Sequence, residues 1–303
     1  MWSSTDIPDQ TGRVALITGG YSGIGLETAR ELAARGATVV VAGRDQESAA
    51  TVADGLGGRA LQVDLGDLES VRRAAAEFRD QFERLDLLIN NAGLMIPPYG
   101  RTASGFERQF GVNHLGHFAL TGLLLDVVLG TPGARVVTVS SNGHRGGVIN
   151  FEDLQSERGY DAMRAYRQSK LANLLFAHEL QRRYPELVSV AAHPGAARTR
   201  LMRSSPWLFR FVVSPRTKLL FSWLIQSEES GAQPTLRAAT DPAVCGGEYF
   251  GPDGWGEFTG RATRVTAEEN AHDLAVQRRL WGVSEQLTGV TYPVPAGMLT
   301  DGP

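Results

Sequence analysis

Short apolar runs alternate with longer helical stretches along most of the chain. The runs are rich in branched residues and lie at residues 13–17, 37–42, 59–65, 85–89, 134–141, 188–193 and 247–250. Continuous apolar runs of this length are typical of strands that are buried on both faces of a parallel sheet. The intervening and following stretches predict helices at residues 26–35, 68–82, 106–128, 164–183, 228–240 and 268–287. This alternation predicts an α/β fold with helices on both faces of the sheet.

The first apolar run leads directly into a glycine-rich turn with the pattern T-G-x-x-x-G-x-G, at residues 18–25. Glycine there lets the chain bend sharply and lets a pyrophosphate approach the backbone, and the N-terminus of the next helix favours the phosphate charge. The spacing differs from the usual G-x-G-x-x-G fingerprint. Strand, turn and helix in this order still predict a dinucleotide site, with the residues Gly19, Tyr21, Ser22, Gly23, Ile24 and Gly25.

The second run ends in Gly43-Arg44-Asp45, where the choice between NAD and NADP is usually made. An acidic residue at this strand end hydrogen-bonds the ribose 2′-hydroxyl of NAD, whereas an arginine accommodates the 2′-phosphate of NADP. Arg44 therefore favours NADP(H). Asp45 leaves two alternatives open, because it could pair with Arg44 or bind the ribose of NAD(H). Arg44 could also be a solvated loop residue.

Asp64 lies at the carboxyl end of the third run, where it could meet the adenine amino group of a cofactor. Leu65, next to it, belongs to the same expected cofactor site. The competing role for Asp64 is to cap the helix predicted at residues 68–82. Asp67 is the better candidate for that cap, because it immediately precedes the helix.

Two residues weaken the long helix that is predicted at residues 106–128. Asn113 and Gly116 both disfavour a helix interior, and an asparagine that bonds backbone can hold a kink and a water there. His114 and His117 lie three positions apart, but no acidic or cysteine partner has suitable spacing. We therefore expect no metal site.

The helix predicted at residues 164–183 carries Tyr166 and Lys170 four positions apart, on one helix face. A neighbouring cation favours the phenolate, so Lys170 is expected to lower the pKa of Tyr166 towards neutrality, where proton transfer is efficient. The fifth run ends on Ser140 and Ser141, at the sheet edge where open α/β folds bind ligands. The loop after them, residues 142–159, is long for a connection of this kind and is expected to shape the substrate mouth.

Composition narrows the function further. The chain has 303 residues, 42% hydrophobic and 21% charged, with a formal net charge of −3 and a pI near 6.1, so nucleic acid is not an expected partner. Its one cysteine, Cys245, fits a reducing compartment, and residues 1–10 do not resemble a signal peptide. No stretch reaches the length of an apolar membrane span. A cytoplasmic location is expected.

The order of the motifs closely resembles the short-chain dehydrogenases/reductases, over about residues 12–287. The resemblance rests on the glycine turn, Asn90-Asn91-Ala92-Gly93, Asn113, Ser141, Tyr166-x-x-x-Lys170 and Pro194-Gly195. Within that family, residues 111–118, the long loop between Ser141 and Tyr166, residues 193–195 and residues 279–284 are most similar to the retinol dehydrogenase and WW-domain-containing oxidoreductase branch.

The resemblance implies a catalytic tetrad and a cofactor cradle. Tyr166 is the expected acid in carbonyl reduction and base in alcohol oxidation. Lys170 lowers the pKa of Tyr166 and holds the nicotinamide ribose. Ser141, rather than Ser140, bonds the substrate oxygen, and Asn113 anchors the water of a proton relay. The further cofactor residues that the resemblance implies are Asn91, Ala92, Gly93, Pro194, Gly195 and Thr199.

The chain is thus expected to form one NAD(P)-binding Rossmann domain over residues 1–303, a doubly wound sheet with strand order 3-2-1-4-5-6-7. Its predicted reaction is the NADP(H)-dependent interconversion of a lipophilic aldehyde or ketone with its alcohol. One alternative is an NAD-dependent, steroid-like secondary-alcohol dehydrogenase. Another is a dinucleotide-sensing binding protein without turnover, which the presence of both Tyr166 and Lys170 disfavours.

Residues 199–227 are the expected substrate lid, because their aromatic and aliphatic side chains are dense between Pro206 and Pro215 and beyond. Burial in the domain or in a subunit contact is an alternative. A membrane-surface helix is another, since Arg210, Arg216 and Lys218 flank the apolar groups. A homo-oligomer is possible, with the helices that hold Asn113 and Tyr166 as its contact surfaces.

Overall fold

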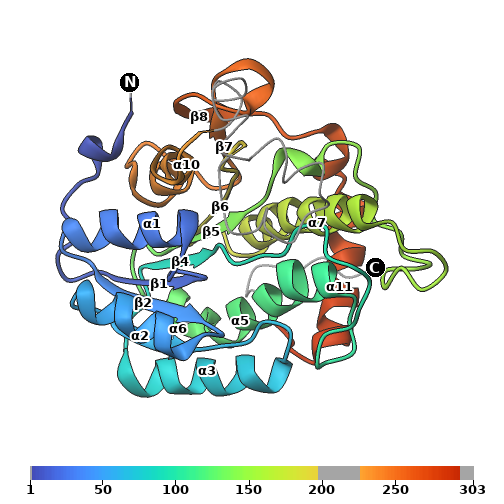
Figure 1. Cartoon of the computed structure of the whole chain (residues 1–303), viewed down its shortest axis with the longest axis horizontal. Coiled ribbons are helices and arrows are strands. Elements are labelled where there is room, and N and C mark those ends of the chain that lie inside the picture. Colours follow the sequence, from blue (N-terminus) through green and yellow to red (C-terminus); the bar gives the residue numbers. More distant parts are fainter. Residues whose placement is uncertain (1, 197–225, 294–303) are drawn as a thin grey trace, which may run out of the picture.

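The structure is a computed structural model, and it describes residues 2–196 and 226–293. One eight-stranded sheet runs through the molecule in the order β3-β2-β1-β4-β5-β6-β7-β8 (Figure 1). Its strands are β1 (Val14–Thr18), β2 (Thr38–Gly43), β3 (Arg59–Gln62), β4 (Leu87–Asn90), β5 (Arg135–Val139), β6 (Val188–Ala192), β7 (Tyr249–Pro252) and β8 (Ala262–Val265). The predicted doubly wound fold and the order of the first seven strands are confirmed.

The eighth strand was not predicted from the sequence. It pairs antiparallel with β7, whereas all the other neighbouring strands are parallel. Of its four residues, Ala-Thr-Arg-Val, only Ala262 is buried. The strand therefore lacks the continuous apolar pattern of the inner strands. A short edge strand of this kind gives a weak sequence signal.

Helices cover both faces of the sheet. α1 (Gly23–Ala34) and α10 (Glu228–Thr240) pack together on one face, over the odd-numbered residues of β1 such as Ala15 and Ile17. α3 (Leu68–Gln81), α5 (Gly116–Leu123) and α7 (Ala162–Arg183) cover the other face, over residues such as Leu16 and Leu88. α2 (Gln46–Gly55) packs on Val41 near the β3 edge. Because every inner strand is covered twice, its residues are apolar on both faces.

α7 is the longest of the described helices. Asp161 caps it by accepting a hydrogen bond from the Arg164 N–H, so the helix begins slightly before the predicted start at residue 164. α11 (Leu274–Thr288) packs against α7 and α5, with the Trp281 ring 5.2 Å from Phe118 and 5.8 Å from Phe176. α11 therefore covers one face of each of these two helices.

The helix predicted at residues 106–128 is present, but it is interrupted at the position of the expected kink. The segment consists of α4 (Arg108–Phe110), a π-helical turn at Gly111–Leu115, α5 and α6 (Leu125–Leu129). The π-turn contains Asn113, as the expected kink did, and Gly116 follows it. A side chain at Gly116 would lie 2.3 Å from the Leu65 carbonyl oxygen, so glycine there lets the end of the third strand segment approach the helix. Widened turns of this kind are frequent at functional sites.

The last predicted helix, at residues 268–287, is also divided. A 3₁₀ turn at Glu269–His272 precedes α11, and Asp273 between them caps α11 through the N–H groups of Ala275 and Val276. Of the expected lid at residues 199–227, only Gln226 and Ser227 belong to the described part of the chain. Among the helices described there, none combines the length and the apolar character needed to cross a membrane.

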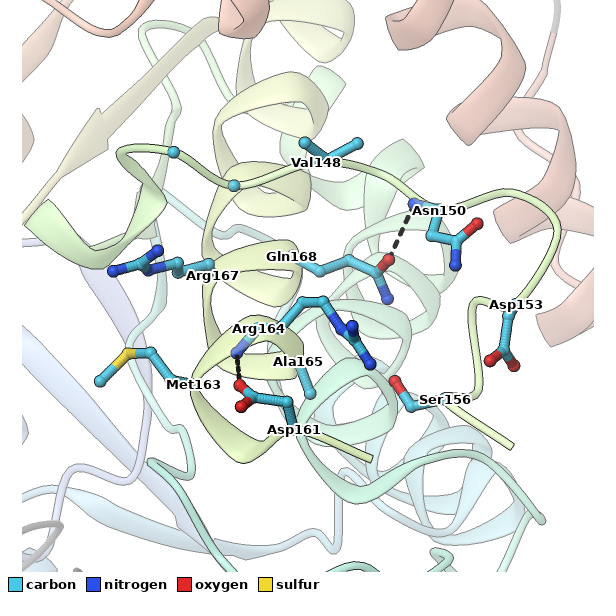
Figure 2. A pocket seen from close by; sticks show the side chains of 12 residues that line it. Val148, Asn150, Asp153, Ser156, Asp161, Met163, Arg164, Ala165, Arg167 and Gln168 are labelled. Carbon is cyan, nitrogen blue, oxygen red and sulfur yellow. Dashed lines mark hydrogen bonds between the residues drawn. The ribbon is translucent and has the colours of Figure 1, made fainter. Parts of the chain in front are cut away.

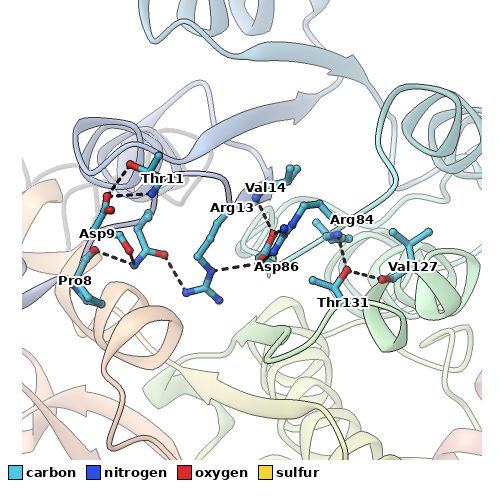
Figure 3. Close-up of polar contacts among 11 residues, drawn as sticks. Pro8, Asp9, Thr11, Arg13, Val14, Arg84, Asp86, Val127 and Thr131 are labelled. Carbon is cyan, nitrogen blue, oxygen red and sulfur yellow. Dashed lines mark hydrogen bonds and ion pairs between the residues drawn. The ribbon is translucent and has the colours of Figure 1, made fainter.

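A buried carboxylate joins the strands at the amino end of the sheet, opposite to the edge where ligands bind. Asp86 is 1% exposed and precedes β4; it accepts the Val14 N–H at 2.9 Å and two bonds from the Arg84 guanidinium at 2.7 and 2.8 Å. Arg13 approaches it from β1 at 3.4 Å (Figure 3). Burial raises the pKa of Asp86, but the bonds and charges of these partners outweigh that effect and lower it overall.

Replacing Asp86 by Asn should therefore destabilise the fold by about 2 kcal/mol at pH 7, because a charged acceptor of several bonds is lost. The lowered pKa of Asp86 means that this contribution is present above the pKa of an unfolded aspartate and disappears as the pH falls through the native value. Urea unfolding of wild type and variant at pH 7 and pH 3 measures it, with the exposed Asp80→Asn as the control. An equal loss at both pH values would contradict the electrostatic account.

Candidate active site

The predicted site residues meet at one edge of the sheet. They lie at or beyond the carboxyl ends of β1, β4, β5 and β6 and in the first half of α7. Tyr166, Lys170 and Ser141 come from α7 and from the end of the β5 segment, and Asn113 comes from the π-turn. The Ser141 hydroxyl lies next to the Tyr166 phenol, close enough to lower the pKa of the phenol. Gly143 lies against the phenol, since a Cβ there would be 2.7 Å from the Tyr166 ring. Glycine at this position lets the loop after β5 approach the tyrosine.

The two serines at the end of the β5 segment have different environments. Ser140 is buried, and its hydroxyl donates to the Lys170 carbonyl oxygen at 2.8 Å, so it ties β5 to α7. Ser141 accepts the Gly143 N–H at 3.0 Å, and its hydroxyl lies beside the Tyr166 phenol. The hydroxyl beside the phenol is therefore that of Ser141, which is the assignment that the family spacing implied.

Lys170 lies deep in the structure, with 5% of its surface exposed. Its ammonium group donates to the Val139 carbonyl oxygen at 3.1 Å and lies 6.0 Å from the centre of the Tyr166 ring. Burial lowers the pKa of Lys170 to about 8. The amine thus gains or loses its proton close to neutral pH, which an exposed lysine does not.

The pKa of Tyr166 is raised, not lowered as the sequence led us to expect. Burial raises it, because a phenolate is poorly solvated in the interior, and the hydrogen bond with Ser141 only partly offsets that effect. The positive charge of Lys170 favours the phenolate, but the desolvation of the buried phenol is the larger effect. Tyr166 consequently holds its proton at neutral pH in this structure.

Asn113 uses both ends of its amide to hold the loop that follows β4. Its Oδ1 accepts the Leu94 N–H at 2.7 Å, and its Nδ2 donates to the Leu94 carbonyl oxygen and to the Ser169 hydroxyl at 3.0 and 2.9 Å. The bonded backbone thus belongs to another segment and not to the helix of Asn113 itself. Gly93 lies beside this contact: a Cβ at this position would be 3.2 Å from the Asn113 Oδ1.

The Thr18 hydroxyl connects three of the expected motifs. It accepts the N–H groups of Asn91 and Ala92 at 2.9 and 3.0 Å, and it lies 2.8 Å from the His117 Nε2. The His117 Nδ1 donates to the Asn113 carbonyl oxygen at 3.0 Å, so Nε2 is left to accept the Thr18 proton. His117 is thus a buried neutral histidine, and burial lowers its pKa to about 4.

His114 has a separate partner, the Ser284 hydroxyl at 2.8 Å, and burial lowers its pKa to about 3. The two histidines therefore bond different elements, α11 and β1, in place of sharing a ligand. Within residues 2–196 and 226–293 no cluster of three metal-binding side chains is found.

The glycine turn after β1 fits the pyrophosphate that its sequence predicts. Gly19 and Gly23 have φ values of +66° and +56°, and a Cβ at Gly25 would lie 2.4 Å from the Gly19 carbonyl oxygen and 2.5 Å from the Asn91 side chain. Ser22, at the start of α1, makes no side-chain capping bond. The first N–H groups of the helix are therefore left without a side-chain cap, next to a backbone that only glycine permits. Ile24 is buried beneath this turn.

Three expected or candidate cofactor residues lie around the end of β2: Tyr21 from the glycine turn, and Arg44 and Asp45 just after the strand. The Tyr21 ring covers Gly43, where a Cβ would be 2.1 Å from the ring. Arg44 is exposed. Asp45 caps α2, with Oδ1 accepting the Ser48 N–H at 3.0 Å and Oδ2 accepting the Ser48 hydroxyl at 2.7 Å. Both carboxylate oxygens of Asp45 are thus used within the protein.

Asp64 and Leu65 lie just beyond β3, close to the same edge. Asp64 accepts the Gly66 N–H at 2.8 Å, and its own N–H donates to the Ser70 hydroxyl. Asp67, and not Asp64, caps α3, as predicted. Asp64 therefore shapes a turn between strand and helix, and its half-buried carboxylate remains at the edge where adenine is expected.

The loop after β6 supplies Pro194 and Gly195. Gly195 has a φ of +62°. The carbonyl oxygen of Pro194 accepts a hydrogen bond from the Gln226 side-chain amide at 2.6 Å. Thr199, the third residue expected in this part of the cofactor site, lies outside the described residues.

A cavity of about 580 Å³ lies on the outer side of α7 (Figure 2). The loop through Val148 and Asn150 bounds it on one side, and Met163, Arg164 and Arg167 of α7 bound it on the other. The Asn150 N–H donates to the Gln168 side-chain oxygen at 2.9 Å and so holds the loop to the helix. Neither Tyr166 nor Ser141 lines it. This cavity is therefore separate from the expected catalytic groups.

Several residues that hold the site together had no clear signal in the sequence. Thr18 and His117 are 99 residues apart, and Arg145 and Glu257, which also meet at this edge, are 112 apart. Glu257 belongs to the glycine-rich turn before β8, a strand that the sequence did not reveal. The unusual density of glycine around it, at residues 251, 254, 256 and 260, is the only hint that the sequence offers.

Comparisons with known proteins agree with this geometry. A family model described as short chain dehydrogenase matches residues 13–206. Human retinol dehydrogenase 13 is 41% identical over 294 residues, covering 93% of this chain and 86% of that protein. Mouse polyprenol dehydrogenase is 41% identical over 301 residues, covering 93% of this chain and 86% of that protein.

Solved structures show the same fold. The crystal structure of an uncharacterized protein from Mycobacterium paratuberculosis is 42% identical and covers 97% of this chain and 99% of its own, with a TM-score of 0.80. The structure of RhlG from Pseudomonas aeruginosa with NADP is 25% identical. The match covers 79% of this chain and 94% of RhlG, with a TM-score of 0.64. The chain belongs to the short-chain dehydrogenase family, in its retinol dehydrogenase branch, and is an NAD(P)-dependent oxidoreductase that interconverts carbonyls and alcohols.

Proposed function

We propose that the protein is an NADP(H)-dependent oxidoreductase that reduces a lipophilic aldehyde or ketone to its alcohol, or catalyses the reverse reaction, with Tyr166 as the acid and base. The observation that carries this proposal is the buried phenol of Tyr166, with the half-buried hydroxyl of Ser141 and the buried Lys170 ammonium group beside it. Hydroxyl donors fixed at one point are what a carbonyl oxygen needs as it becomes an alkoxide.

In this mechanism the bound nicotinamide supplies the hydride. Ser141 donates a hydrogen bond to the carbonyl oxygen and orients it, and Tyr166 transfers its proton to that oxygen as negative charge develops. The raised pKa of Tyr166 keeps the phenol protonated, which suits the acid of a reduction. Lys170, with a pKa of about 8, supplies positive charge beside the phenolate that remains.

Asn113 is proposed to serve the proton relay through its main chain. Its side-chain amide is committed to Leu94 and Ser169, so the carbonyl oxygen is the group left to anchor a water. That oxygen also accepts the His117 ring N–H at 3.0 Å. A carbonyl oxygen has two lone pairs and can accept both.

Replacing Tyr166 by Phe should lower kcat for carbonyl reduction by at least about 1,000-fold, because the proton donor to the alkoxide is removed. Binding of NADPH, followed by nicotinamide fluorescence, should change less than about threefold, since the ring and its packing remain. Tyr184→Phe removes another buried hydroxyl, at the far end of α7, and should leave both quantities near wild type. A Tyr166→Phe enzyme that keeps most of its rate would show that the acid is another group.

The proposed preference for NADP(H) rests on Arg44. Arg44 is exposed at the end of β2, where a 2′-phosphate would lie. Asp45, the alternative reader of an NAD ribose, uses its carboxylate to cap α2. The relative RhlG, whose structure holds NADP, is consistent with the same choice.

Arg44→Ala should weaken NADPH binding about 10- to 100-fold, the loss expected for one charge-assisted contact with a phosphate. NADH binding should change less than about threefold, because NADH lacks that phosphate. Separate titrations of the two cofactors by nicotinamide fluorescence measure this, with the exposed Arg278→Ala as the matched control. If wild type binds NADH more tightly than NADPH, the preference is reversed and the NAD-dependent alternative holds.

The lipophilic substrate class rests on the surface around the site and on the relatives. Tyr99, Val148 and Trp255 are exposed by 43%, 70% and 76%, and they lie in the loops that follow β4, β5 and β7, all at the carboxyl edge of the sheet. Ligand sites are lined mainly by apolar side chains, so apolar residues around this edge support an apolar substrate. Relatives named for retinol and polyprenol, both long isoprenoid alcohols, support the same class.

Among straight-chain aldehydes, kcat/KM should therefore rise with chain length. Each buried methylene contributes about 0.8 kcal/mol, so octanal should exceed butanal by at least about tenfold even if only two of the four additional methylenes are buried. The aldehyde group is constant across this series, which makes butanal the internal control. Equal kcat/KM values across the series would remove the lipophilic assignment but leave the chemistry of Tyr166 in place.

A further inference from the structure

The turn between β7 and β8, which we call the hairpin (residues 253–261), contacts both loops that carry the active-site residues. The Asn142 side chain, next to Ser141, donates to the carbonyl oxygens of Gly256 and Glu257 at 2.9 and 3.0 Å. On the other side, the Ala196 N–H, next to Gly195, donates to the Phe258 carbonyl oxygen at 2.7 Å. The hairpin thus joins the loop after β5 to the loop after β6.

Glu257 makes the same two connections with its side chain. One carboxylate oxygen accepts the Arg145 guanidinium at 2.7 Å, in the loop after β5, and the other lies 3.1 Å from the Nε2 of His193, just after β6. His193 is fully buried, whereas the Arg145 side chain is 42% exposed. The contact with Arg145 is therefore partly screened by water, and the contact with His193 is the stronger of the two.

The hydrogen bonds fix the tautomer of His193. The Gly195 N–H can only donate, and it points at the His193 Nδ1 at 3.2 Å, so Nδ1 accepts and Nε2 carries the proton. The Nε2–H then donates to Glu257. A chain of bonds therefore runs from Glu257 through the imidazole to the backbone of Gly195, a residue expected to line the nicotinamide.

The backbone of Glu257 is also unusual. It has a φ of +56°, in the left-handed region that residues other than glycine seldom adopt, and Gly256 before it has a φ of +60°. Such a conformation persists only where surrounding contacts impose it, and it is concentrated at functional sites. Here the contacts of Glu257 with Arg145, His193 and Asn142 impose it.

We propose that Glu257 is a positioning residue for the reaction: through the hairpin it fixes the Ser141 loop and the Pro194–Gly195 loop relative to each other, so that the substrate oxygen and the nicotinamide are held at a reactive separation. This role rests on the proposed function, because it places carbonyl and cofactor on those two loops. Small misplacements of reacting groups are costly to the rate even when binding is retained.

The test compares two substitutions of Glu257. Glu257→Gln keeps an oxygen that accepts the His193 N–H but loses the charge that pairs with Arg145, whereas Glu257→Ala leaves the buried His193 N–H without a protein partner. We expect kcat to fall about tenfold or more in Glu257→Ala and less than about threefold in Glu257→Gln. The Kd for NADPH should change less than about threefold in both, since the glycine turn and Arg44 are distant from the hairpin. Glu269→Gln, an exposed glutamate in the 3₁₀ turn before α11, is the matched control.

A second readout needs neither cofactor nor turnover. Hydrogen exchange in the free protein should be faster at the N–H groups of Gly195 and Ala196 in Glu257→Ala, and unchanged in Glu257→Gln. If Glu257→Ala does not fold, Gly256→Ala replaces it. A Cβ at Gly256 would lie 2.9 Å from the Phe258 ring and adds strain at φ +60°, so this variant disturbs the hairpin without removing Glu257 and should show the same exchange and the same loss of kcat.

Wild-type exchange and wild-type kcat in Glu257→Ala would overturn the proposal, as would equal losses in the Ala and Gln variants. A tenfold weakening of NADPH binding with unchanged kcat would also overturn it, because it would make Glu257 a binding residue. If the wild-type protein reduces no carbonyl at all, the proposed function has failed; the exchange measurement then still reports whether Glu257 connects the two loops.

Discussion

The Thr18 hydroxyl is the contact on which the arrangement of the active site depends. It lies at the end of the central strand β1, fully buried, and it bonds the backbone of Asn91 and Ala92 and the ring of His117. A buried hydroxyl must find such partners, because leaving one unpaired is costly. Its bonds fix the loop after β4 to the glycine turn and, through His117, to the carbonyl group of Asn113. The glycine turn, the loop after β4 and the segment that holds Asn113 are therefore connected through one side chain.

Burial also determines the proton chemistry of the site. The same loss of solvent raises the pKa of Tyr166 and lowers that of Lys170 to about 8, because each group is less stable in its charged form when buried. The pKa values of the two groups therefore move in opposite directions, and that of Lys170 ends below that of Tyr166. A phenol that keeps its proton and an amine that titrates near neutrality suit a reaction in which a proton and a developing negative charge must be exchanged at one oxygen.

The sequence predicted the features that depend on local pattern. The buried parallel strands, the glycine turn and the family motifs all leave a signal in a few consecutive residues, and the strand order and the placing of Ser141 beside Tyr166 followed from them. Features set by distant contacts did not leave such a signal. The approach of Leu65 to Gly116 is one such contact, and the upward pKa shift of Tyr166 is another such feature, because it comes from burial. The link between Glu257 and His193 likewise joins residues 64 apart in the chain.

The most direct test of the account is a product analysis. Purified protein is mixed with NADPH and octanal, NADPH oxidation is followed by absorbance, and octanol is quantified in the same samples. The account predicts one octanol formed for each NADPH oxidised, with a much slower reaction when NADH replaces NADPH. Tight binding of NADPH without any alcohol formed, from octanal or from a longer isoprenoid aldehyde, would contradict it and would favour a protein that senses the dinucleotide without turning it over.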